Sequence, residues 1–290
     1  LRCDIRDSSA TIAAVEAVRP DAVIHMAAQP LVRDSYQRPR WTMETNVMGT
    51  LSVLEAIAAT ASVQAALMVT TDKVYRNLWR PEGYVEGDAL GGHDPYSASK
   101  AMADILITSW VDSFGGPALA TARAGNVIGG GDVSKDRLMP DLLRGFAAGE
   151  PVVIRYPDAV RPWQHVLDCL SGYLLLLDAL VAGQASGAWN FGPDPSAFRT
   201  VADAAGRACA TWGDGASWVS DGDSHPHEAG LLTLDSSKAH AELGWSDRLS
   251  FDQAIDWTVE WARRVGLGEP ARQVTAEQIS RHWALDRVIG

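Results

Sequence analysis

The chain has 290 residues, which is enough to bury a full core in one large domain or two closely associated ones. Its net charge of −11 and the lack of a basic run exclude a general nucleic-acid-binding surface, and no apolar run is long enough to span a membrane. The three cysteines, Cys3, Cys169 and Cys209, lack metal-ligand spacing, so we expect no metal site and a reducing, cytoplasmic environment.

Strands and helices alternate in the first part of the chain. Residues 1–7 look like a strand end and a loop, after which Ser8 and Ser9 can cap a helix to about Val18. The apolar runs at 22–26, 65–69 and 118–123 read as buried strands, with helices at 42–59 and 95–114 between them. This order predicts an α/β fold with a parallel, doubly wound sheet.

Beyond residue 125 the alternation is replaced by a more irregular pattern. Short strands are predicted at 152–155 and 188–191, and helices at 138–148, 167–182 and 251–265. The pair His225 and His227, separated by a proline, has no evident third ligand, and we interpret it as part of a loop.

The candidate active site begins where the strand at 65–69 ends. Residues 70–73, Thr-Thr-Asp-Lys, follow this strand at the edge where open α/β sheets bind ligands. Asp94 and Pro95 predict a helix start, which places Tyr96 and Lys100 one turn apart on one helical face. A neighbouring lysine favours the phenolate of a tyrosine whose pKa is otherwise about 10. The combination predicts general acid–base chemistry.

These motifs resemble the extended short-chain dehydrogenases/reductases, also called the NAD-dependent epimerase/dehydratase family, and within it the branch that dehydrates CDP-glucose. The Asp-Lys pair at 72–73 is the sharpest mark of this branch, since the dTDP-glucose relatives carry Asp-Glu there. The resemblance extends from Asp4 to about Trp245. It rests on residues 27–33 (AAQPLVR), 45–50 (TNVMGT), 71–73 (TDK), 91–100 (GGHDPYSASK), 123–132 (RAGNVIGGGD) and 161–166 (RPWQHV).

The resemblance implies a 4,6-dehydratase that converts CDP-glucose to CDP-4-keto-6-deoxyglucose. NAD oxidises C4, water is eliminated across C5–C6, and the hydride returns to C6. Tyr96 would take the proton from O4, Lys100 would hold the nicotinamide ribose and lower the tyrosine pKa, and Thr71 would hydrogen-bond near O4. Asp72 would protonate the departing O6 hydroxyl while Lys73 removes the C5 proton.

Further contacts are implied for the cofactor and the nucleotide. Asp4 could equally be a helix-start residue, and Arg161 suits a phosphate clamp as well as an ordinary salt bridge. Asn46 is expected to tie its helix to a loop, and Asp168 reads as a helix-start residue. The implied cofactor contacts are Asp4, Ile5, Ala27, Ala28, Gln29, Tyr96 and Lys100, and the implied substrate contacts are Asn126, Leu138, Arg161 and His165.

The family begins with a glycine-rich phosphate loop that nothing before Asp4 matches, so we expect an amino-terminally incomplete chain. Residues 1–125, with a returning segment near 187–210, would form the NAD-binding Rossmann domain. Residues 126–186 and 211–290 would mainly form a smaller sugar-nucleotide domain. The resemblance also implies deoxysugar biosynthesis for lipopolysaccharide O-antigen, and a homodimer or higher homo-oligomer built on helices 42–59 and 95–114. A nucleotide-sugar epimerase and a catalytically inactive relative remain alternatives.

Overall fold

The computed structural model describes residues 1–80, 82–221 and 232–285. The chain divides into two compact units. The first comprises Leu1–Gly125, Gly172–Phe191 and Leu232–Trp245, and the second comprises Asn126–Ser171, Gly192–Leu231 and Ser246–Gly290. The segments that return to the first unit thus differ from the predicted 187–210.

A four-stranded parallel sheet forms the centre of the first unit, as the alternation of elements predicts. Its strands, in the spatial order β1-β2-β3-β7, are Ala22–His25, Ala65–Val69, Ala118–Ala124 and Gly187–Phe191. The central strand β2 is almost entirely buried, which explains its uninterrupted apolar sequence. The strand end predicted near Leu1 is wrong, since residues 1–7 contain no strand, whereas the loop predicted after it agrees with the turn in which the Asp4 carbonyl accepts the Asp7 N–H at 2.9 Å.

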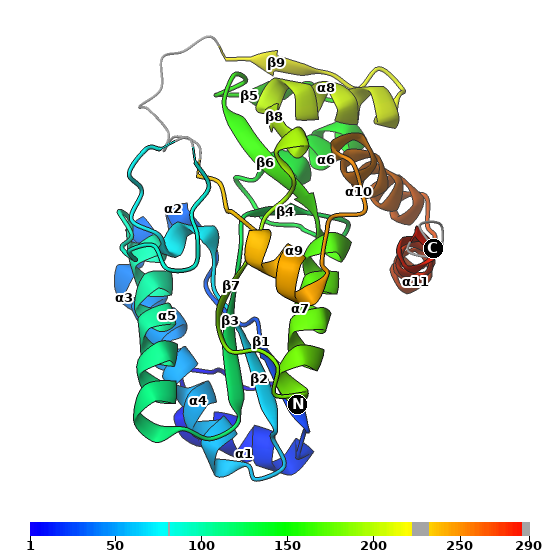
Figure 1. The fold of residues 1–290 in the computed structure, drawn as a ribbon. Helices are drawn as coiled ribbons and strands as arrows, with labels where there is room; N and C mark the ends of the chain where they lie inside the picture. The colour runs from blue at the N-terminus through cyan, green and yellow to red at the C-terminus, as the bar shows by residue number, and fades with distance from the viewer. Residues whose placement is uncertain (81, 222–231, 286–290) are drawn as a thin grey trace. The chain divides into compact units, whose positions relative to one another are not determined.

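Helices cover both faces of this sheet. α4 (Gly49–Ala59) and α5 (Pro95–Phe114) lie on one side, and α7 (Val166–Val181), which enters the first unit at Gly172, lies on the other (Figure 1). α1 (Ser8–Val18) packs against α4, and α9 (Ser237–Leu243) packs against β7. α4 buries Val53, Leu54 and Ile57 in a cluster that includes Met68 of β2 and Leu119 of β3.

Two helix starts differ from the sequence expectation. Asp7, and not Ser8 or Ser9, caps α1, because its side chain accepts the Ala10 N–H. The helix predicted at 42–59 is divided into α3 (Pro39–Met43), a π-helical turn (Glu44–Met48) and α4, and a short α2 (Val32–Gln37) precedes them. The π-helical turn carries Asn46, whose side chain is fixed by three hydrogen bonds.

The second unit combines short strands with longer helices. β4 (Asn126–Ile128) pairs with β6 (Val160–His165) in parallel, and β8 (Phe198–Thr200) pairs with β6 in the antiparallel sense. β5 (Val152–Ile154) pairs with β9 (Trp218–Ser220). The main buried cluster lies among α6 (Leu138–Ala148), α8 (Val201–Trp212) and α10 (Phe251–Gly266).

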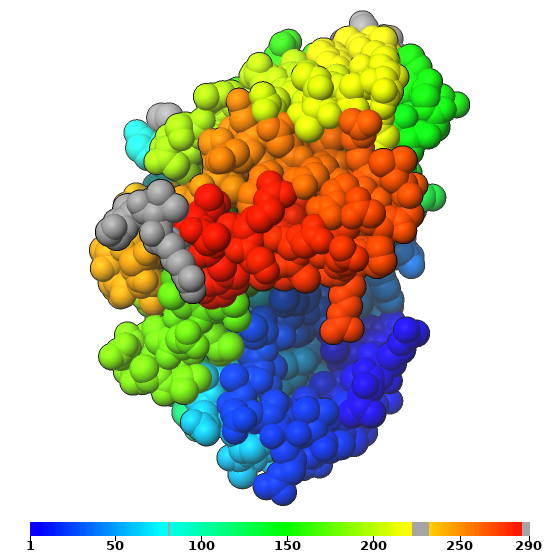
Figure 2. All heavy atoms as spheres, turned by 90° about the vertical axis from the view of Figure 1, so that its right-hand side faces the viewer, coloured from blue at the N-terminus to red at the C-terminus, as the bar shows by residue number. Residues whose placement is uncertain are grey.

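The last helix, α11 (Ala271–Ala284), packs against α10, and together they form the orange-to-red surface in Figure 2. Gln278 is buried and donates from Nε2 to the Trp257 carbonyl at 2.8 Å. Across the described ranges, none of the helices has the length and apolar character needed to cross a membrane.

Candidate active site

The segment predicted to carry the acid–base pair, Thr71–Val74 (the acid–base segment), begins just beyond the carboxyl end of β2. A 3₁₀ turn at Asp72–Val74 brings the side chains of three successive residues together. Thr71 Oγ1 donates to Asp72 Oδ1 at 2.9 Å, and Lys73 Nζ lies 3.2 Å from the same oxygen. Asp72 is 3% exposed, whereas the Lys73 side chain is 37% exposed. A buried carboxylate and an accessible amine are therefore held next to each other.

Tyr96 and Lys100 lie in the first turns of α5, which contacts the turn at Asp72–Val74. The helix begins as predicted, because Asp94 accepts the Ser97 N–H at 3.0 Å and its hydroxyl at 2.5 Å. Lys100 Nζ donates to the carbonyl of Val69, the last residue of β2, at 2.9 Å. Burial lowers the Lys100 pKa to about 8, although the Asp104 charge opposes the shift.

Asn46 joins three segments of the first unit, as expected. Its Oδ1 accepts the Gln29 N–H at 2.7 Å, and its Nδ2 donates to the Gln29 carbonyl at 3.0 Å and to Ser99 Oγ at 2.8 Å. Ser99 lies on α5 between Tyr96 and Lys100. The loop after β1 is thus tied to the helix that carries the Tyr-Lys pair.

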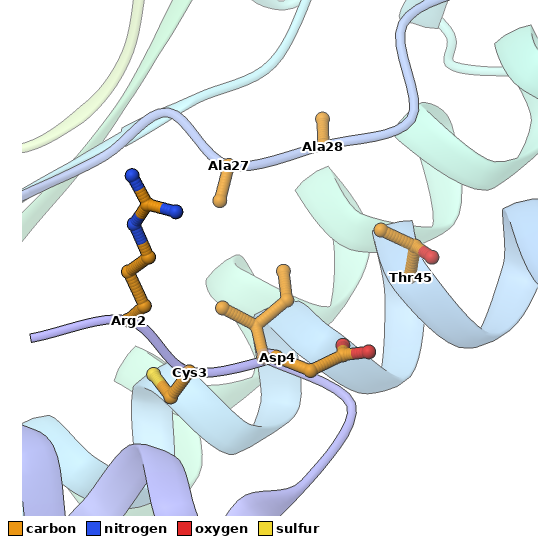
Figure 3. A pocket seen from close by; sticks show the side chains of 7 residues that line it. Arg2, Cys3, Asp4, Ala27, Ala28 and Thr45 are labelled. Carbon is orange, nitrogen blue, oxygen red and sulfur yellow. The ribbon is translucent and has the colours of Figure 1, made fainter.

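An open pocket of about 490 Å³ lies at the edge of the first unit. Figure 3 shows Ala27 and Ala28 on one side of it and residues 2–4 on the other. Four of the predicted cofactor contacts line this pocket, namely Asp4, Ile5, Ala27 and Ala28. Sequence reasoning missed the remaining lining residues, which are Arg2, Cys3 and Thr45.

Thr45 has a feature that only the structure reveals. Its Oγ1 is buried and has no hydrogen-bond partner among the residues described. A buried hydroxyl without a partner is costly unless a ligand or water satisfies it. The signal in the sequence is the position of Thr45 directly before Asn46.

Two of the predicted cofactor contacts, Gln29 and Asp4, have local partners. The Gln29 side chain binds the backbone of Leu31: its Oε1 accepts the Leu31 N–H at 2.6 Å, and its Nε2 donates to the Leu31 carbonyl at 3.0 Å. Gln29 is not among the residues that line the pocket. Hydrogen bonds from Arg6 hold the Asp4 pKa at about 2, so this carboxylate is anionic at neutral pH. The role of each in cofactor binding stays a prediction.

The four predicted substrate contacts all belong to the second unit. Asn126 lies on β4, Leu138 begins α6, and Arg161 and His165 lie on β6, where His165 is in register with Ile128. Burial lowers the His165 pKa to about 4, so its ring is neutral at pH 7. Its Nδ1 accepts the Leu167 N–H at 3.2 Å, while the buried Nε2 has no partner within the described residues.

Asp168 lies in the first turn of α7 and also links this helix to other segments of the second unit. Its buried carboxylate accepts the N–H groups of Arg248 and Leu249 and lies 2.8 Å from His282 Nε2, joining α7 to α11. His225 and His227 lie outside the described residues. Within the described ranges, no group of three or more His, Cys, Asp or Glu side chains could hold a metal ion.

The chain is similar to a family profile and to curated nucleotide-sugar dehydratases. The profile of the NAD dependent epimerase/dehydratase family matches residues 1–192. The chain is 43% identical over 287 residues to CDP-glucose 4,6-dehydratase of Salmonella typhimurium, which covers 96% of this chain and 80% of that protein. It is 29% identical to dTDP-glucose 4,6-dehydratase of Xanthomonas campestris, over 89% of this chain and 77% of that one.

Solved structures share the fold. A UDP-glucose-4-epimerase from Stenotrophomonas maltophila with bound NAD superposes with a TM-score of 0.82 at 23% identity, covering 93% of this chain and 84% of that one. A dTDP-glucose 4,6-dehydratase double mutant from Streptomyces venezuelae, also with NAD bound, gives 0.76 at 26% identity, covering 90% of this chain and 78% of that one.

Proposed function

Because the chain belongs to the NAD dependent epimerase/dehydratase family, we propose that it dehydrates CDP-glucose to CDP-4-keto-6-deoxyglucose. The observation that carries this proposal is the Asp72–Lys73 pair at the end of β2, beside the helix with Tyr96 and Lys100. An epimerase needs the Tyr-Lys pair but not an adjacent acid–base pair. The choice of CDP as the nucleotide is supported by the 43% identity to the Salmonella enzyme.

The chemistry assigned to these side chains is the one that the family resemblance implies, and their closeness to one another supports it. Tyr96, as a phenolate favoured by the nearby Lys100 cation, takes the proton from the O4 hydroxyl. Oxidation at C4 acidifies the C5–H, which Lys73 removes as a neutral amine. Asp72 in its protonated form gives its proton to the departing O6 hydroxyl. The shared oxygen Asp72 Oδ1 is 3.2 Å from Lys73 Nζ, a distance at which a proton can pass between the two residues.

The family is NAD dependent, and the pocket bordered by Asp4 and Thr45 fits such a cofactor. The Ala27 and Ala28 side chains leave room for a flat ring, and the Thr45 hydroxyl offers an unused hydrogen-bonding group. When bound, NAD supplies a reversible hydride acceptor. Lys100, whose Nζ donates to the Val69 carbonyl at the end of β2, is assigned to the cofactor ribose.

The second unit is assigned to the nucleotide. Arg161 supplies a guanidinium suited to a diphosphate, and the unpartnered Nε2 of His165 offers one further polar contact. Asn126 on the adjacent strand β4 and Leu138 at the start of α6 complete the predicted set.

The proposal is tested by offering the protein the CDP, dTDP, UDP and GDP forms of glucose. Mass spectrometry should show the loss of one water from CDP-glucose in preference to the others. A product of unchanged mass with inverted C4 would identify an epimerase. Dehydration of dTDP-glucose in preference to CDP-glucose would refute the nucleotide assignment.

A homodimer is also proposed, together with a cytoplasmic location. Several apolar side chains of the π-helical turn and α5 are exposed, among them Met48, Met102 and Ile105. None of the three cysteines forms a disulfide, which fits a reducing compartment. Sedimentation equilibrium at micromolar concentration should give the mass of a dimer, and a monomer would count against this assembly.

A further inference from the structure

The first unit contains a buried ion pair that none of the proposed catalytic steps uses. Arg123 of β3 donates to both oxygens of Asp104 of α5, from Nε at 2.9 Å and from a terminal nitrogen at 2.6 Å. Arg123 is 3% exposed and Asp104 is fully buried. A buried ion pair seldom stabilises a protein more than well-packed apolar residues would at the same positions, because both charges lose their hydration. A role in fixing geometry would account for this one.

The pair reaches both ends of the acid–base segment. On one side, Thr70 Oγ1 donates to Asp104 Oδ2 at 2.9 Å, and Thr70 directly precedes Thr71. On the other side, Arg123 Nη1 donates to the Tyr75 hydroxyl at 2.8 Å, and Tyr75 directly follows Val74. The four residues between these two anchors, Thr71–Val74, include Thr71, Asp72 and Lys73.

Within the segment itself two backbone hydrogen bonds are long, although the Val74 carbonyl accepts the Gly91 N–H at 2.8 Å. The Val74 N–H reaches the Thr71 carbonyl and the Tyr75 N–H reaches the Asp72 carbonyl, each at 3.3 Å, which is long for an N–H···O bond. The anchors, in contrast, are buried and continue into the core, because the Tyr75 hydroxyl donates to Asn190 Oδ1 of β7 at 2.7 Å. The side-chain hydrogen bonds at its two ends therefore add to this one short backbone bond in fixing the conformation of the segment.

We infer that Asp104 and Arg123 are positioning residues, whose ion pair clamps both ends of Thr71–Val74 and thereby holds Asp72 and Lys73 in the geometry that elimination needs. This inference rests on the proposed dehydration. Asp104 also lies one turn beyond Lys100 on α5, so the same pair borders the Tyr-Lys site.

The test removes the two anchors without removing a charge. Thr70→Val and Tyr75→Phe each delete one hydroxyl and keep the side-chain shape, whereas Asp104→Asn leaves Arg123 buried without its counter-charge and can fail to fold. Small misplacements of reacting groups cost up to about 100-fold in rate, so we expect kcat for water elimination to fall by about 10- to 100-fold in each variant. KM for CDP-glucose should be unchanged, and Thr70→Ser, which keeps the hydroxyl, should restore kcat.

Thr121→Val is the matched control. Thr121, on β3, is also a buried threonine, but its hydroxyl has no partner in the described parts of the chain, so its loss should leave kcat unchanged. Hydrogen exchange of the amides of Thr71–Tyr75 gives a readout that does not depend on activity. These amides should exchange about 10-fold faster in Thr70→Val and Tyr75→Phe, and at the wild-type rate in Thr121→Val.

The outcomes separate this inference from the proposed function. Unchanged exchange in both anchor variants, a rise in KM alone, or a failure of Thr70→Ser to restore kcat would overturn the positioning role. If exchange rises as expected but the wild-type protein dehydrates no nucleotide-glucose, the clamp is upheld and the proposed function is refuted.

Discussion

Replacing Lys100 by methionine should stabilise the protein while it abolishes catalysis. Burial lowers the Lys100 pKa from 10.5 to about 8. A decrease of about 2.5 units corresponds to about 3 kcal/mol of unfolding free energy lost at neutral pH. Methionine fills a similar volume without a charge but forfeits the hydrogen bond to the Val69 carbonyl, which is worth about 1 kcal/mol. The net gain in unfolding free energy is therefore about 2 kcal/mol.

The pH dependence of this gain follows from the direction of the shift. Above the unfolded pKa of 10.5, Lys100 is neutral in both states and its burial costs the wild-type protein no unfolding free energy. As the pH falls from there through the folded pKa of about 8, the unfolded state takes up the proton more readily, and unfolding free energy is lost. The advantage of Lys100→Met should therefore be full at about pH 7 and roughly 1 kcal/mol smaller at about pH 9.

Urea unfolding followed by the fluorescence of the 11 tryptophans measures the effect at both pH values. Lys135→Met, which replaces an exposed lysine, is the control and should leave the unfolding free energy unchanged. A Lys100→Met protein that is less stable than the wild type at neutral pH would refute the reasoning. An advantage that grows with pH would do so as well.

Three further predictions concern chemistry, packing and acid stability. Lys73→Ala should slow elimination by about 10²–10⁴ and accumulate 4-keto-glucose nucleotide without exchange of the C5 proton, and undiminished deuterium uptake at C5 would remove Lys73 as the base. Gly92→Ala should unfold at lower urea and lose activity, because its Cβ would lie 2.2 Å from the Ser97 carbonyl carbon at the start of α5; an unchanged midpoint would contradict this. Burial lowers the His25 pKa from 6.5 to about 4. His25 therefore contributes about 3 kcal/mol of unfolding free energy, which is present above pH 6.5 and is lost as the pH falls through about 4. His25→Gln should flatten the acid limb of a stability–pH curve, and an equally steep limb would contradict this.

The sheet of the first unit could be predicted from the sequence because its strands are short apolar runs with clear endings. Residues 65–69 are apolar because β2 is central and buried on both faces, and Asp94 with Pro95 fixes the start of α5 through local hydrogen bonding alone. The placement of Tyr96 and Lys100 on α5 follows from these local signals.

The remaining elements depend on contacts between distant residues, which a single sequence does not reveal. α11 is largely polar, and partners elsewhere in the chain hold it, including Asp168 for His282 and the Trp257 carbonyl for Gln278. The Asp104–Arg123 pair joins a helix to a strand and has no periodic signature. α8 did have a local signal, the capping box formed by Thr200 and Asp203.

The central claim is that the chain moves hydrogen from C4 of a CDP-linked glucose to C6 while it removes water across C5–C6. It is tested most directly by supplying CDP-glucose that carries deuterium at C4 and locating the label in the product by NMR. The account predicts that the deuterium appears at C6 of a 4-keto-6-deoxy product. Deuterium that stays at C4 of a hexose, or that is lost to solvent, would contradict it.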